Sequence, residues 1–299
     1  MEEGRASFTA IVAAMCRAAH LLIDDEPKIH RDNLALPLSG ADSETQFRAA
    51  YDAFLFELTR HCGAELAQKV ATYYRAIAVM RSRYTEDTLE QALTRGVRQL
   101  VILGAGLDSF AFRLGDLRDV LQVFEVDHPA SQRWKRNRLA ELHIDVPPNV
   151  SFIPVDFERQ AMPEELRSGG YDPRQPTFFS WLGVTQYLTE DAVFGTLGYI
   201  ASVTPGSEVV FEYPRLEALQ GPDDREWRAL AKALASSRGE PIVSEFDPHR
   251  LGTQLRELGF SSIEDFSPED ANARYFAART DGLRLPHVYH LMHARVEMG

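Results

Sequence analysis

Apolar residues along the chain follow two different periods, and the change between them falls near residue 95. In the first part they recur at helical spacing, as in Phe47, Tyr51, Phe54 and Leu58, and Gly63 interrupts this pattern before it continues to Met80. From residue 99 onward, short apolar runs alternate with helical stretches. This alternation predicts a mostly parallel β-sheet with helices on both faces.

The two periods together predict the following elements. Helices are expected over Phe8–Ala19, from Thr85 to a stop at Gly96, and over Ala130–Leu142, Glu190–Val203 and Asp247–Leu258. Strands are expected over Gln99–Leu103, Leu121–Val126, Val150–Val155, Thr177–Leu182, Glu208–Tyr213, Phe260–Phe266 and His287–Val296. The carboxyl ends of parallel strands share one edge of a sheet, so side chains that follow these strands should meet in one crevice.

Composition narrows the class of protein. The 299 residues are 44% hydrophobic and 25% charged, as in ordinary soluble domains. A formal net charge of −12 argues against a nucleic-acid substrate. Cys16 and Cys62 are the only cysteines, which excludes a disulfide framework or a cysteine-rich metal site and favours the cytoplasm. The apolar stretch over Phe8–Ala19 is interrupted by Arg17 and is too short to span a membrane. The sequence indicates no oligomeric state.

The candidate chemistry lies between residues 98 and 128. The apolar run that ends at Leu103 is followed directly by Gly104 and Gly106, and the next run ends at Asp127. This pattern predicts a strand, a tight glycine turn, a helix and a second strand. Glycines let a backbone approach a ligand closely, and an acid at the end of the second strand can accept both ribose hydroxyls. Asp127 lies 23 positions after Gly104, near the roughly 20 expected for ribose binding.

Two residues of the turn indicate which cofactor it holds. A dinucleotide fingerprint would have a third glycine where the chain has Ser109, and it would keep negative charge away from the phosphates. Asp108 stands at that place. A carboxylate there suits S-adenosylmethionine, which carries an ammonium group, a sulfonium and a ribose but no phosphate.

The chain is accordingly predicted to be one methyltransferase domain over residues 1–299. It comprises a helical N-terminal extension or lid (1–95), a cofactor-binding core (96–213), a cap insertion (214–246) and the C-terminal part of the sheet (247–299). The expected fold class is α/β, with a Rossmann-like seven-stranded sheet. Two closing strands after the fifth are typical of class I methyltransferases.

Several motifs in fixed order carry a resemblance to a known family. The chain resembles the leucine carboxyl methyltransferase-like family over roughly residues 70 to 215, and only the layout is similar outside them. The motifs are RSRYTED at 81–87, QLVILGAGLD at 99–108, FRL at 112–114, FEVDHP at 124–129 and PVDF at 154–157. The resemblance implies a cytoplasmic enzyme that uses S-adenosylmethionine, without a metal, to methylate a small molecule.

The resemblance also implies roles for particular residues. Arg81, with Arg83 as its neighbour, would grip the methionyl carboxylate of the cofactor, as suits a bidentate guanidinium. Asp127 would hold the ribose, with Glu125 as the second choice on the same face of the strand. The adenine amine would be bound by Asp156 and its ring would contact Phe157; these two complete the cofactor-binding set with Gly104, Gly106 and Asp108.

One departure from the family pattern leaves alternatives open. Many members have a glutamate before Gly-Val, and here Leu182 takes that place ahead of Gly183 and Val184. No catalytic residue follows from the sequence. If the acceptor is a hydroxyl that needs a base, the candidates are Glu212 and Tyr187, with His290 and His293 further off, whereas a carboxylate acceptor needs none. The alternatives are a nicotinamide-dependent oxidoreductase and a non-catalytic protein that binds S-adenosylmethionine.

Overall fold

The seven predicted strands all form, and they build one sheet. The computed structural model describes residues 7–156, 161–216 and 221–297. In these residues the strand order is β3-β2-β1-β4-β5-β7-β6. The strands are β1 (Gln99–Leu103), β2 (Gln122–Asp127), β3 (Val150–Pro154), β4 (Thr177–Trp181), β5 (Glu208–Pro214), β6 (Ser262–Phe266) and β7 (Tyr289–Arg295). All pairs are parallel except those of β7, which runs antiparallel to both β5 and β6.

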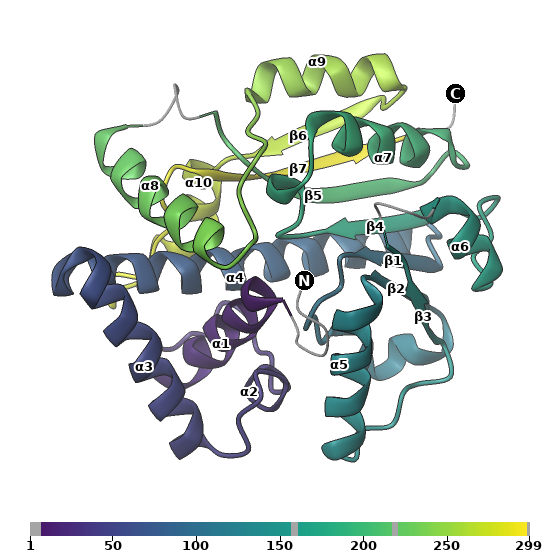
Figure 1. The fold of residues 1–299 in the computed structure, drawn as a ribbon. Coiled ribbons are helices and arrows are strands. Elements are labelled where there is room, and N and C mark those ends of the chain that lie inside the picture. Colours follow the sequence, from purple (N-terminus) through teal and green to yellow (C-terminus); the bar gives the residue numbers. More distant parts are fainter. Residues whose placement is uncertain (1–6, 157–160, 217–220, 298–299) are drawn as a thin grey trace.

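The central strands are buried and mostly apolar because helices cover both faces of the sheet. Every residue of β1, β4 and β5 is buried. Leu100 and Ile102 of β1 pack in a core with α4 (Ala64–Thr94), whereas Val101 and Leu103 face the opposite core. That second core contains α6 (Met162–Ser168), α7 (Glu190–Ser202) and α9 (Pro248–Leu258). Figure 1 shows α7 and α9 on the side of the sheet away from α4, so the predicted layers are confirmed.

The N-terminal extension forms four helices in its described residues, 7–95, and its last helix differs from the prediction. They are α1 (Phe8–Ile23), α2 (Ala35–Leu38), α3 (Glu44–Cys62) and α4, and the first three gather beside α4 (Figure 1). Gly63 separates α3 from α4 with a φ of 81°, as predicted. A helix start at Thr85 is wrong, because α4 runs through it without a break. Thr88 donates its hydroxyl to the Tyr84 carbonyl inside the helix, so it does not act as a cap.

The segment after the glycine turn also differs from the prediction. Instead of an α-helix it forms two 3₁₀ turns, η1 (Phe110–Phe112) and η2 (Gly115–Asp119). Gly115 has a φ of 52°, which an α-helix does not allow, and Arg113 is held by the side chains of Ser109 and Glu86. The long helix α4 covers this part of the sheet instead.

The remaining helices include one that was predicted and several short ones. The expected helix near residue 130 forms as α5 (Pro129–Glu141), and the cap segment forms α8 (Pro222–Ser237). The shorter elements are η3 (Thr185–Tyr187), α10 (Pro268–Ala271) and η5 (Asn272–Phe276). Within the described ranges no helix is long and apolar enough to cross a membrane.

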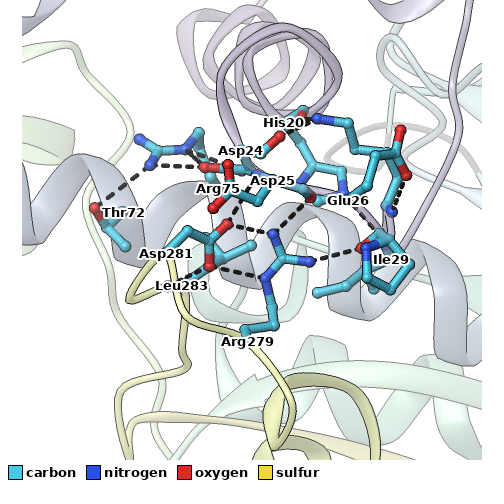
Figure 2. A network of polar contacts seen from close by, with 12 residues as sticks. His20, Asp24, Asp25, Glu26, Ile29, Thr72, Arg75, Arg279, Asp281 and Leu283 are labelled. Atoms are coloured by element: carbon cyan, nitrogen blue, oxygen red, sulfur yellow. Dashed lines mark hydrogen bonds and ion pairs between the residues drawn. The ribbon is translucent and has the colours of Figure 1, made fainter.

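A buried polar network fastens the N-terminal extension to the body of the protein (Figure 2). His20 on α1 pairs through Nδ1 with Asp24 at 2.9 Å, and Asp24 also accepts a bond of 3.1 Å from Arg75 on α4. From the C-terminal loop, Arg279 donates to the carbonyls of Asp25 and Pro27 at 2.9 and 2.7 Å. The segment that follows α1 is therefore held by α4 through Asp24 and by the C-terminal loop through Arg279.

Candidate functional site

A large cavity lies where several of the predicted residues meet, namely Arg81, Gly104, Gly106, Asp108 and Asp127. Its volume is about 960 Å³, near the upper end of the range for ligand pockets. The floor is formed by the carboxyl ends of β1, β2, β4 and β5, and the walls by α1, α3, α4 and α8. No cluster of three or more metal-binding side chains occurs in the part of the chain that the structure describes.

The glycine turn forms one end of this cavity. Gly104 and Gly106 have φ angles of 65° and 47°, which favour glycine. A Cβ on Gly104 would lie 2.4 Å from a methyl group of Val184, and one on Gly106 would lie 3.1 Å from the Cβ of Ala10 on α1. The turn therefore has no room for side chains, and its backbone is exposed to the cavity.

Asp127 lies directly beside the turn. Its two carboxylate oxygens accept hydrogen bonds from the backbone N–H groups of Gly106 at 2.5 Å and His128 at 2.6 Å. Burial raises the pKa of Asp127, although these two N–H groups act in the opposite direction. Each oxygen keeps a further lone pair, so a ligand that brings two hydroxyls can bind here.

Asp108 occupies the opposite side of the turn. It lines the cavity, and its Oδ1 accepts a bond of 2.7 Å from the N–H of Phe110. Asp108 is thus bonded at the start of η1 and still lines the cavity with its negative charge.

Arg81 reaches the cavity from α4 and forms an ion pair there. Its Nη1 donates to Oε2 of Glu212 on β5 at 2.7 Å, and the Glu212 side chain is only 1% exposed. Burial opposes the charge of Arg81, but the attraction of Glu212 outweighs it and the pKa of the guanidinium is raised. Gly183 packs against this guanidinium, since a Cβ there would lie 2.6 Å from Nη1. The bond uses one of the five N–H donors of Arg81.

A second charged network holds the turn against the N-terminal extension. Arg17 on α1 donates to the Leu107 carbonyl at 2.7 Å and to Asp32 at 2.8 Å. Arg113 follows the turn and joins Asp32, at 3.5 Å, to Glu86 on α4, at 2.6 Å. Despite burial, the neighbouring cations hold the pKa of Asp32 and of Glu86 at about 2. Sequence reasoning missed this network, because its members share no motif.

Three of the expected residues that the structure describes do not lie in the cavity wall, namely Arg83, Glu125 and Asp156. Glu125 is buried and paired with Lys135 at 2.6 Å, and burial raises its pKa to about 7, so we do not retain it as a cofactor ligand. The reason is that Glu125 lies two residues before Asp127 on β2, where Lys135 of α5 covers it. Asp156 follows β3 and is half-buried, outside the cavity lining. Phe157 lies outside the described residues. Arg83, the neighbour of Arg81, pairs with Asp87 on the surface of α4.

Comparison with known proteins places this site in a family. The family model described as leucine carboxyl methyltransferase matches residues 10–201, well over half of the chain. The chain is 33% identical to YktD of Bacillus subtilis (strain 168), which bears the name of an S-adenosyl-L-methionine-dependent methyltransferase; the match covers 98% of this chain and 99% of that protein. A protein of the same descriptive name from Mycolicibacterium paratuberculosis (strain ATCC BAA-968 / K-10) is 34% identical, over 70% of this chain and 67% of its own length.

Two solved structures share the fold. A DUF574 family protein from Streptomyces avermitilis MA-4680 superposes with a TM-score of 0.60 at 16% identity, with 98% of each chain covered. A protein from Thermobifida fusca YX, described as a methyltransferase, gives a TM-score of 0.58 at 17% identity, with 99% and 96% covered. These likenesses confirm the seven-stranded Rossmann-like architecture.

Proposed function

The chain belongs to the leucine carboxyl methyltransferase family and is an S-adenosylmethionine-dependent methyltransferase, and we propose that it methylates an oxygen atom of a small molecule. The observation that carries the proposal is the convergence of Gly106, Asp127 and Arg81 on one cavity. The acceptor oxygen would belong to a carboxylate, as in the family's name, or to a hydroxyl. This family assignment contradicts both alternatives, the nicotinamide-dependent oxidoreductase and the non-catalytic binding protein.

The residues in the cavity fit the parts of S-adenosylmethionine. Asp127 would accept the ribose hydroxyls beside the glycine turn, and Arg81 would bind the methionyl carboxylate with the donors that Glu212 leaves over. The backbone of Gly104 and Gly106 lines the cavity and would allow close approach, and Asp108 would face the cationic part of the ligand. We propose these four contacts as the cofactor site. Asp156 and Phe157 remain predictions for the adenine ring.

A partly covered cavity supports a small molecule over a protein substrate. The N-terminus of α1 is joined to the segment after α8, where Glu240 accepts bonds from the Ser7 hydroxyl at 2.7 Å and from the Thr9 N–H at 3.3 Å. Arg238 of the same segment lies over the ring of Phe8, 4.5 Å from its centre. These contacts hold the start of α1 and the segment after α8 together over the cavity. A protein segment would have to displace them in order to enter.

When bound, S-adenosylmethionine supplies an electrophilic methyl group on an already good leaving group. The protein therefore needs mainly to align the acceptor and to exclude water. The ion pair of Arg81 and Glu212 fixes the floor of the cavity between α4 and β5, and α1 with the segment after α8 closes it from above. No acid or metal is required by this chemistry.

Calorimetric titration tests the proposal directly. We expect heat of binding for S-adenosylmethionine and S-adenosylhomocysteine at equal protein concentration, and none for NAD. Mass spectrometry of reactions with a metabolite panel should then find products heavier by one methylene unit, and NMR of these products should show the methyl protons of a methoxy group. Binding of NAD without binding of either adenosyl compound would refute the cofactor site, and methylation at nitrogen alone would refute the oxygen acceptor.

A further inference from the structure

The order of strands divides the cavity into two halves. Asp127 and the glycine turn lie at the ends of β2 and β1, whereas Glu212 and Tyr289 belong to β5 and β7. Neighbouring strands are about 4.8 Å apart, so β2 and β5 are separated by roughly 14 Å, three strand spacings. If the nucleoside binds beside Asp127, as proposed above, the half over β5 and β7 is left for the acceptor.

The half over β5 and β7 is mostly apolar. A series of ring contacts leads from α3 to the sheet: Phe54 to Tyr74 at 6.5 Å between centres, Tyr74 to Trp227 at 6.0 Å and Trp227 to Tyr289 at 5.9 Å. Small and aliphatic residues of α3 and α8 extend this wall, namely Ala53, Leu58, Ala231, Leu234 and Ala235. A molecule that fills this half must present an apolar body to these walls.

Its floor contains a buried hydrogen-bond acceptor that lacks a partner. Oε2 of Glu212 is bonded to Arg81, but Oε1 is buried and has no hydrogen-bond partner among the described residues. The amide oxygen of Gln186, which also lines the cavity, is in the same situation. An amide can rotate to present its nitrogen, whereas a carboxylate only accepts, so Glu212 decides what the ligand must bring.

Leaving a buried carboxylate oxygen unpartnered is unfavourable, and a ligand that donates to it removes this cost. An ionised carboxylate on the ligand would instead place two negative charges together, because the charge of Arg81 is already shared with Glu212. Resting on the proposed function, we propose that the methyl acceptor is an apolar molecule whose hydroxyl group donates to Oε1 of Glu212.

The step is balanced without a further reactant. The acceptor oxygen forms the new bond to the methyl carbon, the bond from that carbon to sulfur breaks, and its electron pair stays on sulfur. The hydroxyl proton moves to the Glu212 carboxylate. Glu212 is thus a catalytic residue in this proposal, since it touches the reacting hydroxyl.

Matched ligands separate a hydroxyl from a carboxylate acceptor. With the protein saturated by S-adenosylhomocysteine, calorimetry would compare 2-naphthol with 2-naphthoate and 1-decanol with decanoate, each pair sharing one apolar body. We expect at least one hydroxyl compound to bind, at least tenfold more tightly than its carboxylate partner. A preference for the carboxylates, or no binding of either alcohol, would overturn the proposal.

Variants then assign the contact. We expect Glu212→Gln to weaken binding of the alcohol by about tenfold to a hundredfold, as for loss of a bond to a charged group, and to leave S-adenosylhomocysteine bound as before. Glu208→Gln is the matched control, because Glu208 is also buried on β5 and paired with Arg95 but lies outside the cavity lining. Its binding of the alcohol should not change.

The apolar wall is tested on α8. Ala235→Phe should fill part of the acceptor half and abolish alcohol binding, while Ala233→Phe, at an exposed position of the same helix, should not. The outcome that would refute the assignment is a Glu212→Gln protein that loses S-adenosylhomocysteine and keeps the alcohol, since Glu212 would then serve the cofactor's ammonium. Failure of the wild-type protein to bind S-adenosylhomocysteine would refute the proposed function instead.

Discussion

Gly183 should influence cofactor binding indirectly, through the position of Arg81. Its φ is 70°, and an added Cβ would lie 2.6 Å from Nη1 and 3.1 Å from Nη2 of the Arg81 guanidinium. Such a contact cannot persist, so in Gly183→Ala the guanidinium must move away from Glu212, whose side chain is buried. The change therefore tests the position of Arg81 without altering its charge.

Two effects of different origin can be worked out for this variant. Left-handed backbone costs a residue with a Cβ about 1–2 kcal/mol, whatever the surroundings. Disturbing the charge-assisted bond between Arg81 and Glu212 adds about 1.5–3 kcal/mol. If Arg81 binds the methionyl carboxylate, its displacement should also weaken S-adenosylhomocysteine by about tenfold to a hundredfold, which corresponds to a similar free energy.

A second glycine isolates the first effect. Gly282 has a φ of 77°, and an added Cβ there would meet nothing within 4 Å. Urea unfolding of Gly282→Ala therefore measures the backbone cost alone, and calorimetry with S-adenosylhomocysteine should give the wild-type affinity. If Gly183→Ala matched Gly282→Ala in both stability and affinity, the assignment of Arg81 to the cofactor carboxylate would be refuted.

Three further outcomes are expected from the site. Asp127→Ala should weaken S-adenosylhomocysteine by about 1–3 kcal/mol in a folded protein, and an unchanged dissociation constant would remove Asp127 as the ribose acid. Hydrogen exchange should show added protection in residues 10–40 when S-adenosylhomocysteine binds; protection confined to the glycine turn would make these helices mere scaffold. The folded-state pKa of Asp32 and of Glu86 is about 2, below the ordinary 3.8 and 4.5. Their ionised forms thus stabilise the fold above about pH 5, and this contribution, about 2 kcal/mol for the buried Asp32, is lost as the pH falls towards 2. Urea unfolding between pH 6 and pH 3 should show a shallower loss in Asp32→Asn.

The sheet and the glycine turn could be predicted because their signals are local. A strand buried on both faces is a short apolar run, and Gly104 and Gly106 stand directly after one. The acid at Asp127 follows from the same rule at the end of the next strand. Each of these features depends on residues within a few positions of one another, so the pattern alone specifies them.

The errors arose where tertiary contacts decide the local structure. Thr85 and Thr88 have the composition of a helix start, yet both are buried inside α4, which continues because it packs along the sheet. After the turn, Arg113 is drawn into contacts with Asp32 and Glu86, which are distant in sequence. A periodicity argument has no access to such partners.

The partners of the site residues were hidden for the same reason. Arg81 and Glu212 are separated by 131 positions, and Arg17 reaches the Leu107 carbonyl across 90. The sequence indicates that these residues carry charge, but only the packing of α1 and α4 against the sheet determines which charges meet. Glu125 shows the opposite error. Its place in the sequence suggested a cofactor ligand, but in the fold its carboxylate is buried and paired with Lys135.

The pair of Arg81 and Glu212 connects the two halves of the cavity, and this position gives it a role beyond charge balance. Displacement of a methyl group depends on the alignment of the two reactants, and an error of about 1 Å is costly. In our proposals the cofactor carboxylate binds Arg81 and the acceptor hydroxyl binds Glu212, so one hydrogen bond of 2.7 Å sets the distance between the two anchors. Gly183→Ala displaces Arg81 and breaks this hydrogen bond, whereas Glu212→Gln changes only the anchor of the acceptor. The first should therefore affect binding of cofactor and acceptor together, and the second should separate them.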